Sequence, residues 1–179
     1  MTGRTTSEKR ERTRQLRAEL TDRGPVMEAA AAFLAVRPRS EAETRGRLLK
    51  LGYPQPLVDE VLVRLIEMSY LDDEAFARAW VESRDRSRPR GSAGLKHELM
   101  IKGVALDTID AVLAEREQAA PEDDADMTAA RTLLARRAAA LEREPDENRR
   151  RQKAYGLLAR NGFGADVCRE AVNAEFPRS

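Results

Sequence analysis

Two arginine-rich stretches carry the side chains best suited to binding a charged partner. The first, RDRSRPRGSAGLKHELMIK, spans residues 84–102 and contains six basic and two acidic residues. The guanidinium of arginine is a planar fork of donors that matches carboxylates and phosphates. Arginine at every second position does not follow one helical face, so we expect these residues at a helix end and in a loop. The candidate partner-binding residues in this stretch are Arg84, Arg86, Arg88, Arg90, Lys96 and Lys102.

The second arginine-rich stretch, NRRRQKAYGLLARNG, spans residues 148–162. Its side chains offer the same donors to carboxylates or phosphates. For both stretches the alternative is a solvated loop or helix face that contacts no partner, and the sequence leaves both possibilities open. The candidate partner-binding residues in the second stretch are Arg149, Arg150, Arg151, Lys153 and Arg160.

The acidic cluster of Asp72, Asp73 and Glu74 offers carboxylates for metal binding or acid–base catalysis. The cluster follows Tyr70 and Leu71 and opens a predicted helix. An aspartate at that position caps free backbone N–H groups, and further carboxylates favour the positive end of the helix. We therefore expect helix capping, with Leu71 packed onto the first turn, rather than metal or acid–base chemistry.

No enzyme signature is present elsewhere in the sequence. It lacks a glycine-rich phosphate loop followed by Lys-Ser or Lys-Thr, and it lacks a serine in a nucleophile elbow. Cys168 occupies an apolar helical position and is expected to be buried, whereas His97 is expected at the surface. A single cysteine and a single histidine exclude an internal disulfide and a multi-histidine metal centre. We therefore expect no catalytic activity, no cofactor and no metal site.

The elements that must position these side chains repeat along the chain. Gly52, Gly103 and Gly162 lie 51 and 59 residues apart. In each case a leucine lies four residues before the glycine, and apolar residues lie one and six residues after it. Glycine ends a helix by adopting the left-handed conformation that a Cβ disfavours, and a second apolar helix then begins. Each glycine is therefore predicted to mark a tight turn between two packed helices.

A further helix precedes each of these pairs and completes a three-helix unit. The preceding helices are MEAAAAFLAV, DDEAFARAWVESRDRS and MTAARTLLARRAAALE. Ser40 and Glu43 form a predicted capping box. Pro56 and Asp107 mark the starts of the helices that follow the first two glycines. One such unit cannot bury enough apolar surface alone, so neighbouring units must stack.

The sequence therefore predicts an all-α fold of three tandem three-helix repeats that form an elongated, curved helical array. Alanine and arginine are abundant helix formers here, and aromatic residues are only 4%. We expect a mobile, basic N-terminal arm at 1–24 with no more than one amphipathic turn. Repeats are expected at 25–70, 71–116 and 127–179, with an acidic linker at 117–126.

Charge is unevenly distributed along the 179 residues, although the formal net charge is only +1. Residues 1–23, 84–102 and 131–160 carry +3, +4 and +5, whereas residues 107–126 carry −7. Such alternation suits a charged, extended partner; solvated arginine-rich helices beside an acidic linker are the alternative. The chain has no run of eighteen apolar residues and no apolar stretch typical of a signal peptide, so we expect no membrane contact. A single cysteine suits the reducing cytoplasm, and we expect a cytoplasmic monomer.

The phrase YLDDEAFARAWVESRDRSRPRGSAGLKHELMIKGV resembles the RecX family of recombinase regulators. The phrase AYGLLARNGFGADVCREAV is similar to that family's C-terminal pattern, with Asn161 where the family usually has a basic residue. The resemblance covers residues 27–176 and agrees with the repeats. In the central phrase it rests on Tyr70, Asp72, Asp73, Phe76, Ala77, Arg84, Gly91, Leu95, Leu99, Lys102 and Gly103.

This resemblance implies an all-α regulator that is not an enzyme. It implies binding to the helical RecA–DNA filament, with inhibition of strand exchange, of filament-stimulated ATP hydrolysis and of repressor cleavage. The implied body either lies in the filament groove across adjacent subunits or acts at the growing end. From the resemblance we predict a role in homologous recombination, DNA repair and the SOS response.

The competing hypothesis is a helical-repeat module that binds naked DNA through the same arginines. Three-helix units with a tight glycine turn resemble helix-turn-helix readers. Few aromatic residues are available for base stacking, and the single tryptophan, Trp80, fits a core position. This module predicts tight, salt-sensitive binding to naked DNA, whereas the filament regulator predicts weak DNA contact and strong filament binding.

Overall fold

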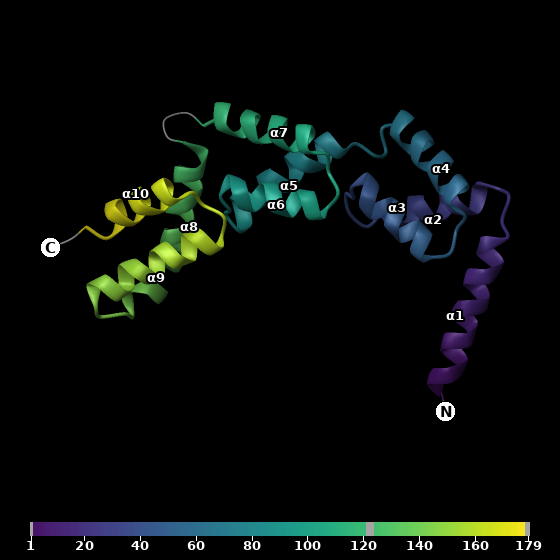
Figure 1. The fold of residues 1–179 in the computed structure, drawn as a ribbon, viewed down its shortest axis with the longest axis horizontal. Coiled ribbons are helices and arrows are strands. Elements are labelled where there is room, and N and C mark those ends of the chain that lie inside the picture. Colours follow the sequence, from purple (N-terminus) through teal and green to yellow (C-terminus); the bar gives the residue numbers. More distant parts are fainter. Residues whose placement is uncertain (1, 121–123, 178–179) are drawn as a thin grey trace. The chain divides into compact units, whose positions relative to one another are not determined.

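The computed structural model describes residues 2–120 and 124–177, with side chains from residue 7 onward. Within these residues it contains ten helices and no strand, which confirms the predicted all-α class (Figure 1). The helices divide between two compact units. Unit 1 comprises Met1–Phe76 and Lys102–Val104, and unit 2 comprises Ala77–Ile101 and Ala105–Ser179.

Unit 1 is built from four helices and the beginning of a fifth. The four are α1 (Thr2–Ala18), α2 (Gly24–Leu34), α3 (Glu41–Lys50) and α4 (Gln55–Glu67). Helices α2, α3 and α4 pack against one another, and the buried residues of each recur mainly at intervals of three or four. Their shared core includes Val26, Ala30, Leu48, Val58, Val61, Leu62 and Leu65.

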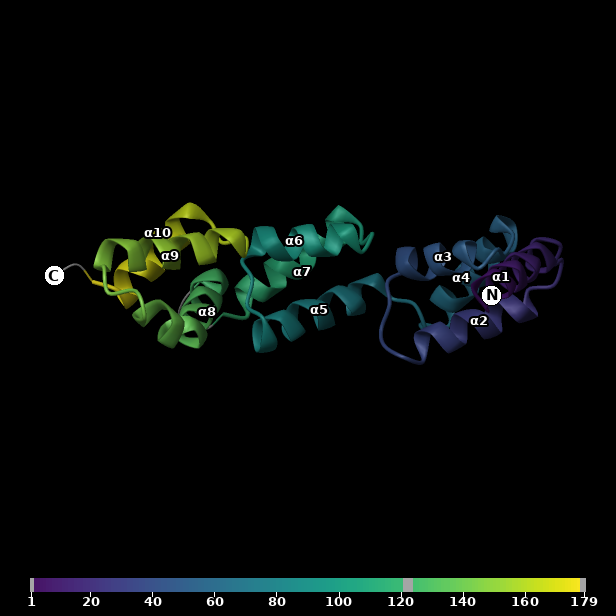
Figure 2. The same ribbon diagram turned by 90° about the horizontal axis from the view of Figure 1, so that it is seen from below.

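Unit 2 holds most of α5 and all the helices that follow it. These helices are α5 (Asp73–Ser87), α6 (Ser92–Ile101), α7 (Leu106–Gln118), α8 (Ala125–Glu142), α9 (Glu147–Arg160) and α10 (Ala165–Glu175). Figures 1 and 2 both show α8, α9 and α10 gathered around one core. That core includes Met127, Ala130, Leu133, Leu134, Leu158, Cys168 and Val172.

The three glycine turns confirm the predicted repeat. Gly52, Gly103 and Gly162 have φ values of 96°, 78° and 82°, the left-handed conformation that favours glycine. The residue after each glycine is buried. At the first turn the N–H of Tyr53 donates to the carbonyl of Leu48 at 3.3 Å, which folds the chain back onto the helix it has just left.

The predicted helix starts are confirmed at Ser40 and Asp72. Ser40 Oγ accepts from the N–H of Glu43, and the Glu43 side chain accepts in return from the N–H of Ser40. Asp72 Oδ1 accepts from the first-turn N–H groups of α5 at 2.9 and 3.0 Å. The prediction for Asp107 is wrong in detail, because the N-cap of α7 is Ala105, two residues earlier, and the helix begins at Leu106. Asp107 instead lies in the first turn, near the positive helix end.

The N-terminal arm contains more helix than its sequence pattern indicates. We predicted at most one amphipathic turn within 1–24, whereas α1 spans Thr2–Ala18. Arg, Glu and Gln favour helix without an apolar stripe, so propensity accounts for the difference. The mobility of the arm and the domain boundaries stay predictions.

The predicted acidic linker at 117–126 includes residues 121–123, which lie outside the described residues. On one side of that gap, α7 continues to Gln118. On the other side, α8 begins at Ala125, with Asp124 at its N-cap. Residues 117, 118, 125 and 126 are therefore helical.

Candidate interaction surface

Two of the candidate arginines hold the chain after α5 in place. Arg84 Nε lies 2.6 Å from Glu98 Oε2, and Arg90 Nε lies 2.9 Å from Glu98 Oε1. Trp80 Nε1 donates to the same carboxylate at 2.8 Å, and the Arg84 guanidinium lies over the Trp80 ring. Burial alone would raise the pKa of Glu98, but the hydrogen bonds from Arg84 and Trp80 hold it below the usual range. Glu98 is therefore an anchor that both arginines share.

Arg86 and Arg88 project from the arginine loop, which we define as residues 86–91. The Arg86 side chain is 74% exposed, and its ion-pair partner Glu82 lies 3.8 Å away. Arg88 is exposed, and it has no ion pair within the described part of the chain. The backbone, by contrast, is held, because Arg136 donates 2.7 Å hydrogen bonds to the last two carbonyls of α5. The loop thus presents two guanidiniums on a fixed backbone.

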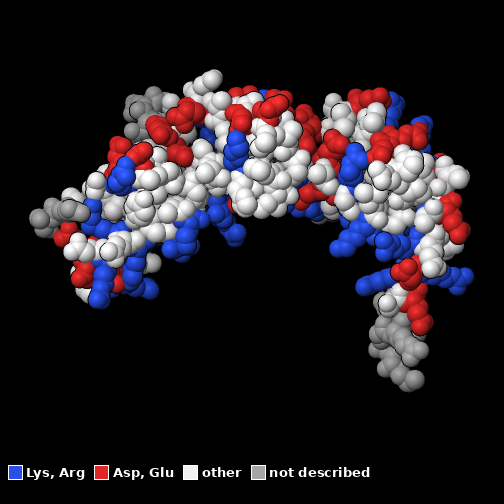
Figure 3. Space-filling model, in the orientation of Figure 1, with Lys and Arg blue, Asp and Glu red and all other residues white. Residues whose placement is uncertain are grey.

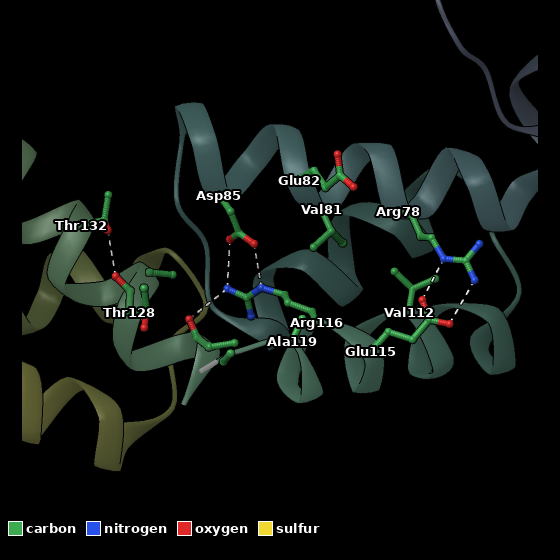
Figure 4. A pocket seen from close by; sticks show the side chains of 13 residues that line it. Arg78, Val81, Glu82, Asp85, Val112, Glu115, Arg116, Ala119, Thr128 and Thr132 are labelled. Atoms are coloured by element: carbon green, nitrogen blue, oxygen red, sulfur yellow. Dashed lines mark hydrogen bonds and ion pairs between the residues drawn. The ribbon is translucent and has the colours of Figure 1, made fainter. Parts of the chain in front are cut away.

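A buried ion network clamps both ends of the arginine loop (Figure 4). Arg116 of α7 is 7% exposed and donates to Asp85 at 2.9 and 3.0 Å and to Asp126 at 2.7 Å. Asp126 also accepts from the N–H and the hydroxyl of Ser92, both at 2.9 Å. Burial alone would lower the pKa of Arg116, but its hydrogen bonds to the two carboxylates raise it. Asp85 precedes the loop and Ser92 follows it, so the network fixes the loop from both sides.

A groove of about 410 Å³ lies beside this network, between α5, α7 and α8 (Figure 4). Val81, Val112 and Ala129 give it an apolar lining. On its rim Arg78 Nε lies 2.8 Å from Glu115 Oε2, and the hydrogen bonds from Arg78 lower the pKa of Glu115. The two arginines of the lining each form an ion pair with a lining carboxylate, Arg78 with Glu115 and Arg116 with Asp85.

Three glycines join the arginine loop to the turn at the end of α9. A Cβ on Gly91 would lie 2.3 Å from the carbonyl oxygen of Gly162. A Cβ on Gly94 would lie 2.6 Å from the carbonyl oxygen of Asn161, which also accepts from the N–H of Gly91 at 3.1 Å. Only glycine permits backbones to approach so closely. The structure thus brings the first candidate stretch beside the end of α9, where Arg160 is exposed.

The start of α9 lies about 20 Å along the helix from Arg160, so the second stretch is not brought together as one cluster. Arg150 Nε donates to the carbonyl of Glu144 at 3.0 Å, and Lys153 forms an ion pair with the Glu144 carboxylate. The hydrogen bond from Lys153 lowers the pKa of Glu144. Arg149 is exposed and has no ion pair with another described residue.

The remaining three candidates are each engaged within their own unit. The ion pairs of Lys96 and Lys102 are partly exposed and contribute little stability, but they do reduce the charge that these two residues offer to a partner. The engaged partners are Asn173 and the Phe176 carbonyl for Arg151, Asp110 at 2.5 Å for Lys96, and Glu43 at 2.8 Å for Lys102.

Charge is separated on the surface of unit 2. Figure 3 shows acidic side chains over α7 and basic side chains near the ends of α6 and α9.

The acidic cluster at the start of α5 is used in capping. Asp73 Oδ1 accepts from the N–H of Glu41, the first residue of α3, at 2.8 Å. Burial raises the pKa of Asp73. In the described ranges no group of three or more His, Cys, Asp and Glu side chains is placed to hold a metal ion.

Cys168 and His97 lie where the sequence placed them. Cys168 is buried, which raises the pKa of its thiol, and His97 is exposed.

None of the helices described is both long and apolar enough to cross a membrane.

Sequence reasoning missed the two arginines that position the loop. Arg136 lies on α8 and Arg116 on α7, both outside the candidate stretches. The sequence does contain a signal for the role of Arg116, because it is the only basic residue in the strongly acidic stretch 107–126. A lone cation among carboxylates is a reasonable candidate for a buried ion pair.

Three models of known domains match successive parts of the chain. The first three-helix domain of RecX matches residues 27–65, the second matches residues 72–113 and the third matches residues 124–172. Each match contains one of the three glycine turns described above. The structure is therefore one of three tandem helical domains, in agreement with the predicted repeats.

Similar proteins and solved structures agree with these matches. The chain is 37% identical over 144 residues to the regulatory protein RecX of Mycobacterium avium (strain 104), covering 80% of each sequence. It is 35% identical over 145 residues to the regulatory protein RecX of Mycobacterium sp. (strain JLS), covering 80% of this chain and 78% of that one. The crystal structure of RecX from Lactobacillus salivarius shares the fold, with a TM-score of 0.71, 18% identity, and coverage of 85% of this chain and 95% of that one. From its sequence relatives and its three domain matches, the chain belongs to the RecX family.

Proposed function

We propose that this chain binds the filament that RecA forms on DNA and inhibits its recombinase, ATPase and coprotease activities. Such a protein modulates homologous recombination and DNA repair. The observation that carries the proposal is membership of the RecX family, whose similar members are named regulatory proteins. The structure supports the proposal by supplying a cationic surface that is fixed in position.

We assign the partner contacts to the candidate arginines that remain exposed. Arg86 and Arg88 extend from the arginine loop, Arg160 lies at the end of α9 that packs near that loop, and Arg149 is exposed at the start of α9. Arg84 and Arg90 act indirectly, by holding the loop on Glu98. Exposed guanidiniums suit carboxylates on a recombinase protomer or phosphates of the DNA it carries.

Rigid presentation favours this role. A side chain on a fixed backbone loses less conformational entropy on binding than one on a loop that must first become ordered. Arg116 and Arg136 fix the two sides of the arginine loop in the free protein. Contacts repeated over several filament subunits then add avidity without a single strong pair.

The test is ATP hydrolysis by RecA on single-stranded DNA, with this chain added at substoichiometric amounts, beside a titration of the chain with naked DNA. The proposal expects hydrolysis to fall at concentrations where binding to naked DNA is weak. If a few molecules silence many protomers, the chain acts at filament ends. Undiminished hydrolysis, together with tight and salt-sensitive binding to naked DNA, would overturn the proposal in favour of a DNA-binding module.

A further inference from the structure

A second basic surface lies in unit 1, where α1 meets the C-terminal end of α3. The two helices enclose a cleft of about 670 Å³. Figure 3 shows basic side chains gathered on unit 1 where α1 leaves it. Among the described lining residues the only carboxylate is that of Glu11. The cationic lining residues are Lys9, Arg10, Arg14, Arg17, Arg47 and Lys50.

The cleft is a built feature, because α1 is fastened to the glycine turn after α3. Arg17 Nη1 donates to the carbonyl of Leu51 at 3.3 Å, and the Arg17 guanidinium lies 5.1 Å from the centroid of the Tyr53 ring. The backbone of Arg14 packs onto Gly52, where a Cβ would lie 2.9 Å from the Arg14 carbonyl oxygen. These contacts hold the cations of α1 against those of α3.

The cations that line this cleft lack the carboxylate partners that many cations elsewhere in the molecule have. Within the described residues, no carboxylate forms an ion pair with Lys9, Arg10, Arg14 or Lys50. In the two arginine-rich stretches, by contrast, Arg84, Arg90, Lys96, Lys102 and Lys153 each form an ion pair with a carboxylate. Unscreened like charges repel one another, so a bound polyanion would stabilise the arrangement. The negative C-terminal end of α3 explains why a cation such as Lys50 is favourable there. It does not explain why α1 places further cations beside it.

The chemistry of the lining favours a nucleic acid over a protein. A specific protein interface needs a desolvated apolar centre, and Leu51 is the only apolar residue in the described lining. Backbone binding of nucleic acid needs only Lys and Arg against phosphates. The lining also lacks an aromatic ring on which a base could stack. We propose that the cleft between α1 and α3 binds the sugar–phosphate backbone of a nucleic acid strand, without regard to base sequence.

The test is fluorescence anisotropy of the full chain with a labelled single strand and with a duplex of the same length, over a series of salt concentrations. In the cleft variant, Lys9→Gln, Arg10→Gln and Lys50→Gln are combined, which leaves the fastening residue Arg17 in place. We expect roughly a tenfold loss of affinity at low salt and a salt slope smaller by about 2 for the single strand, since each phosphate contact contributes about 0.7. Far-UV circular dichroism should show unchanged helicity.

A control variant separates a local site from a general charge effect. The matched control combines Arg64→Gln, Arg137→Gln and Arg143→Gln, which removes the same charge from exposed positions outside the cleft. It should keep the wild-type affinity and salt slope. An equal loss in the matched control, an unchanged affinity in the cleft variant, or binding of an acidic polyglutamate in place of DNA would overturn the proposal.

Because this assay uses no RecA, its outcome is independent of the proposed filament function. If the wild type inhibits RecA but the cleft variant binds nucleic acid as well as the wild type does, only the inference about the cleft is refuted. If the cleft variant loses DNA affinity but the wild type leaves RecA hydrolysis unchanged, only the proposed function is refuted.

Discussion

Replacing Arg116 by methionine should destabilise unit 2 more than any ordinary surface change. The substitution keeps a long apolar stem in the network but removes the guanidinium that joins Asp85 to Asp126. Both carboxylates then remain partly buried without their cation. The Asp126 side chain is only 14% exposed, whereas that of Asp85 is 36% exposed. Asp126 therefore bears most of the penalty.

The expected cost follows from that burial. Removing one partner of a buried ion pair typically costs about 3–5 kcal/mol, because the other charge stays uncompensated. Water screens Asp85, and Ser92 still donates two hydrogen bonds to Asp126, so the lower end of that range applies here. We expect Arg116→Met to lower the free energy of unfolding by about 3 kcal/mol.

The assay is urea unfolding of the full chain, followed by the fluorescence of Trp80, which lies in unit 2. A second variant combines Arg116→Met with Asp85→Asn and Asp126→Asn, so that no charge is left unpaired. It should recover more than about 1 kcal/mol of the loss, because neutral groups are cheaper to bury than an isolated charge. A single substitution that costs less than about 1 kcal/mol, the scale of a surface pair, would refute the buried-network account. A combined variant no more stable than Arg116→Met would refute it as well.

Three further perturbations test the other structural assignments. Gly103→Val should lower the melting midpoint by more than a surface change, because φ at Gly103 is +78° and a Cβ there would lie 2.3 Å from the Cβ of Ala42. An unchanged midpoint would contradict the assignment of a glycine turn at this position. Asp72→Ala should cost about 1 kcal/mol of unfolding free energy through loss of the α5 cap; full stability with lost RecA inhibition would instead make Asp72 a contact residue. The lowered pKa of Glu98 means that its contribution to stability is complete above the ordinary value of 4.5 and is lost as the pH falls through the folded-state pKa. Glu98→Gln should therefore flatten the acid side of the stability–pH curve measured by thermal unfolding, and an unaltered curve would count against the shared anchor.

The sequence predicted those parts of the fold that local rules determine. Gly52, Gly103 and Gly162 were identifiable because a left-handed helix end needs glycine and the flanking apolar pattern repeats. The Ser40 capping box and the Asp72 cap were identifiable because a cap and its N–H partners lie within three residues of one another. These features depend on few neighbours, so sequence spacing alone specifies them.

The sequence could not show which candidate arginines are free. Arg84 and Arg90 share Glu98, which lies on the next helix and enters the contact only after α5 and α6 have packed. Arg116 and Arg136 reach the arginine loop from α7 and α8 for the same reason. Pairing over such separations depends on tertiary geometry, which charge counts along the chain do not contain.

The most direct test of the central claim is the concentration of this chain that halves RecA ATP hydrolysis on single-stranded DNA, measured for three proteins. They are the wild type, the variant Arg86→Ala with Arg88→Ala, and a matched control, Arg137→Ala with Arg143→Ala, in which both residues are exposed outside the arginine loop. Our account predicts inhibition by the wild type and the control, and a half-inhibitory concentration roughly tenfold higher or more for the loop variant, since two lost ionic contacts of about 1 kcal/mol each suffice for that change. Equal inhibition by all three would remove the arginine loop from the contact surface. No inhibition by the wild type would contradict the proposed function itself.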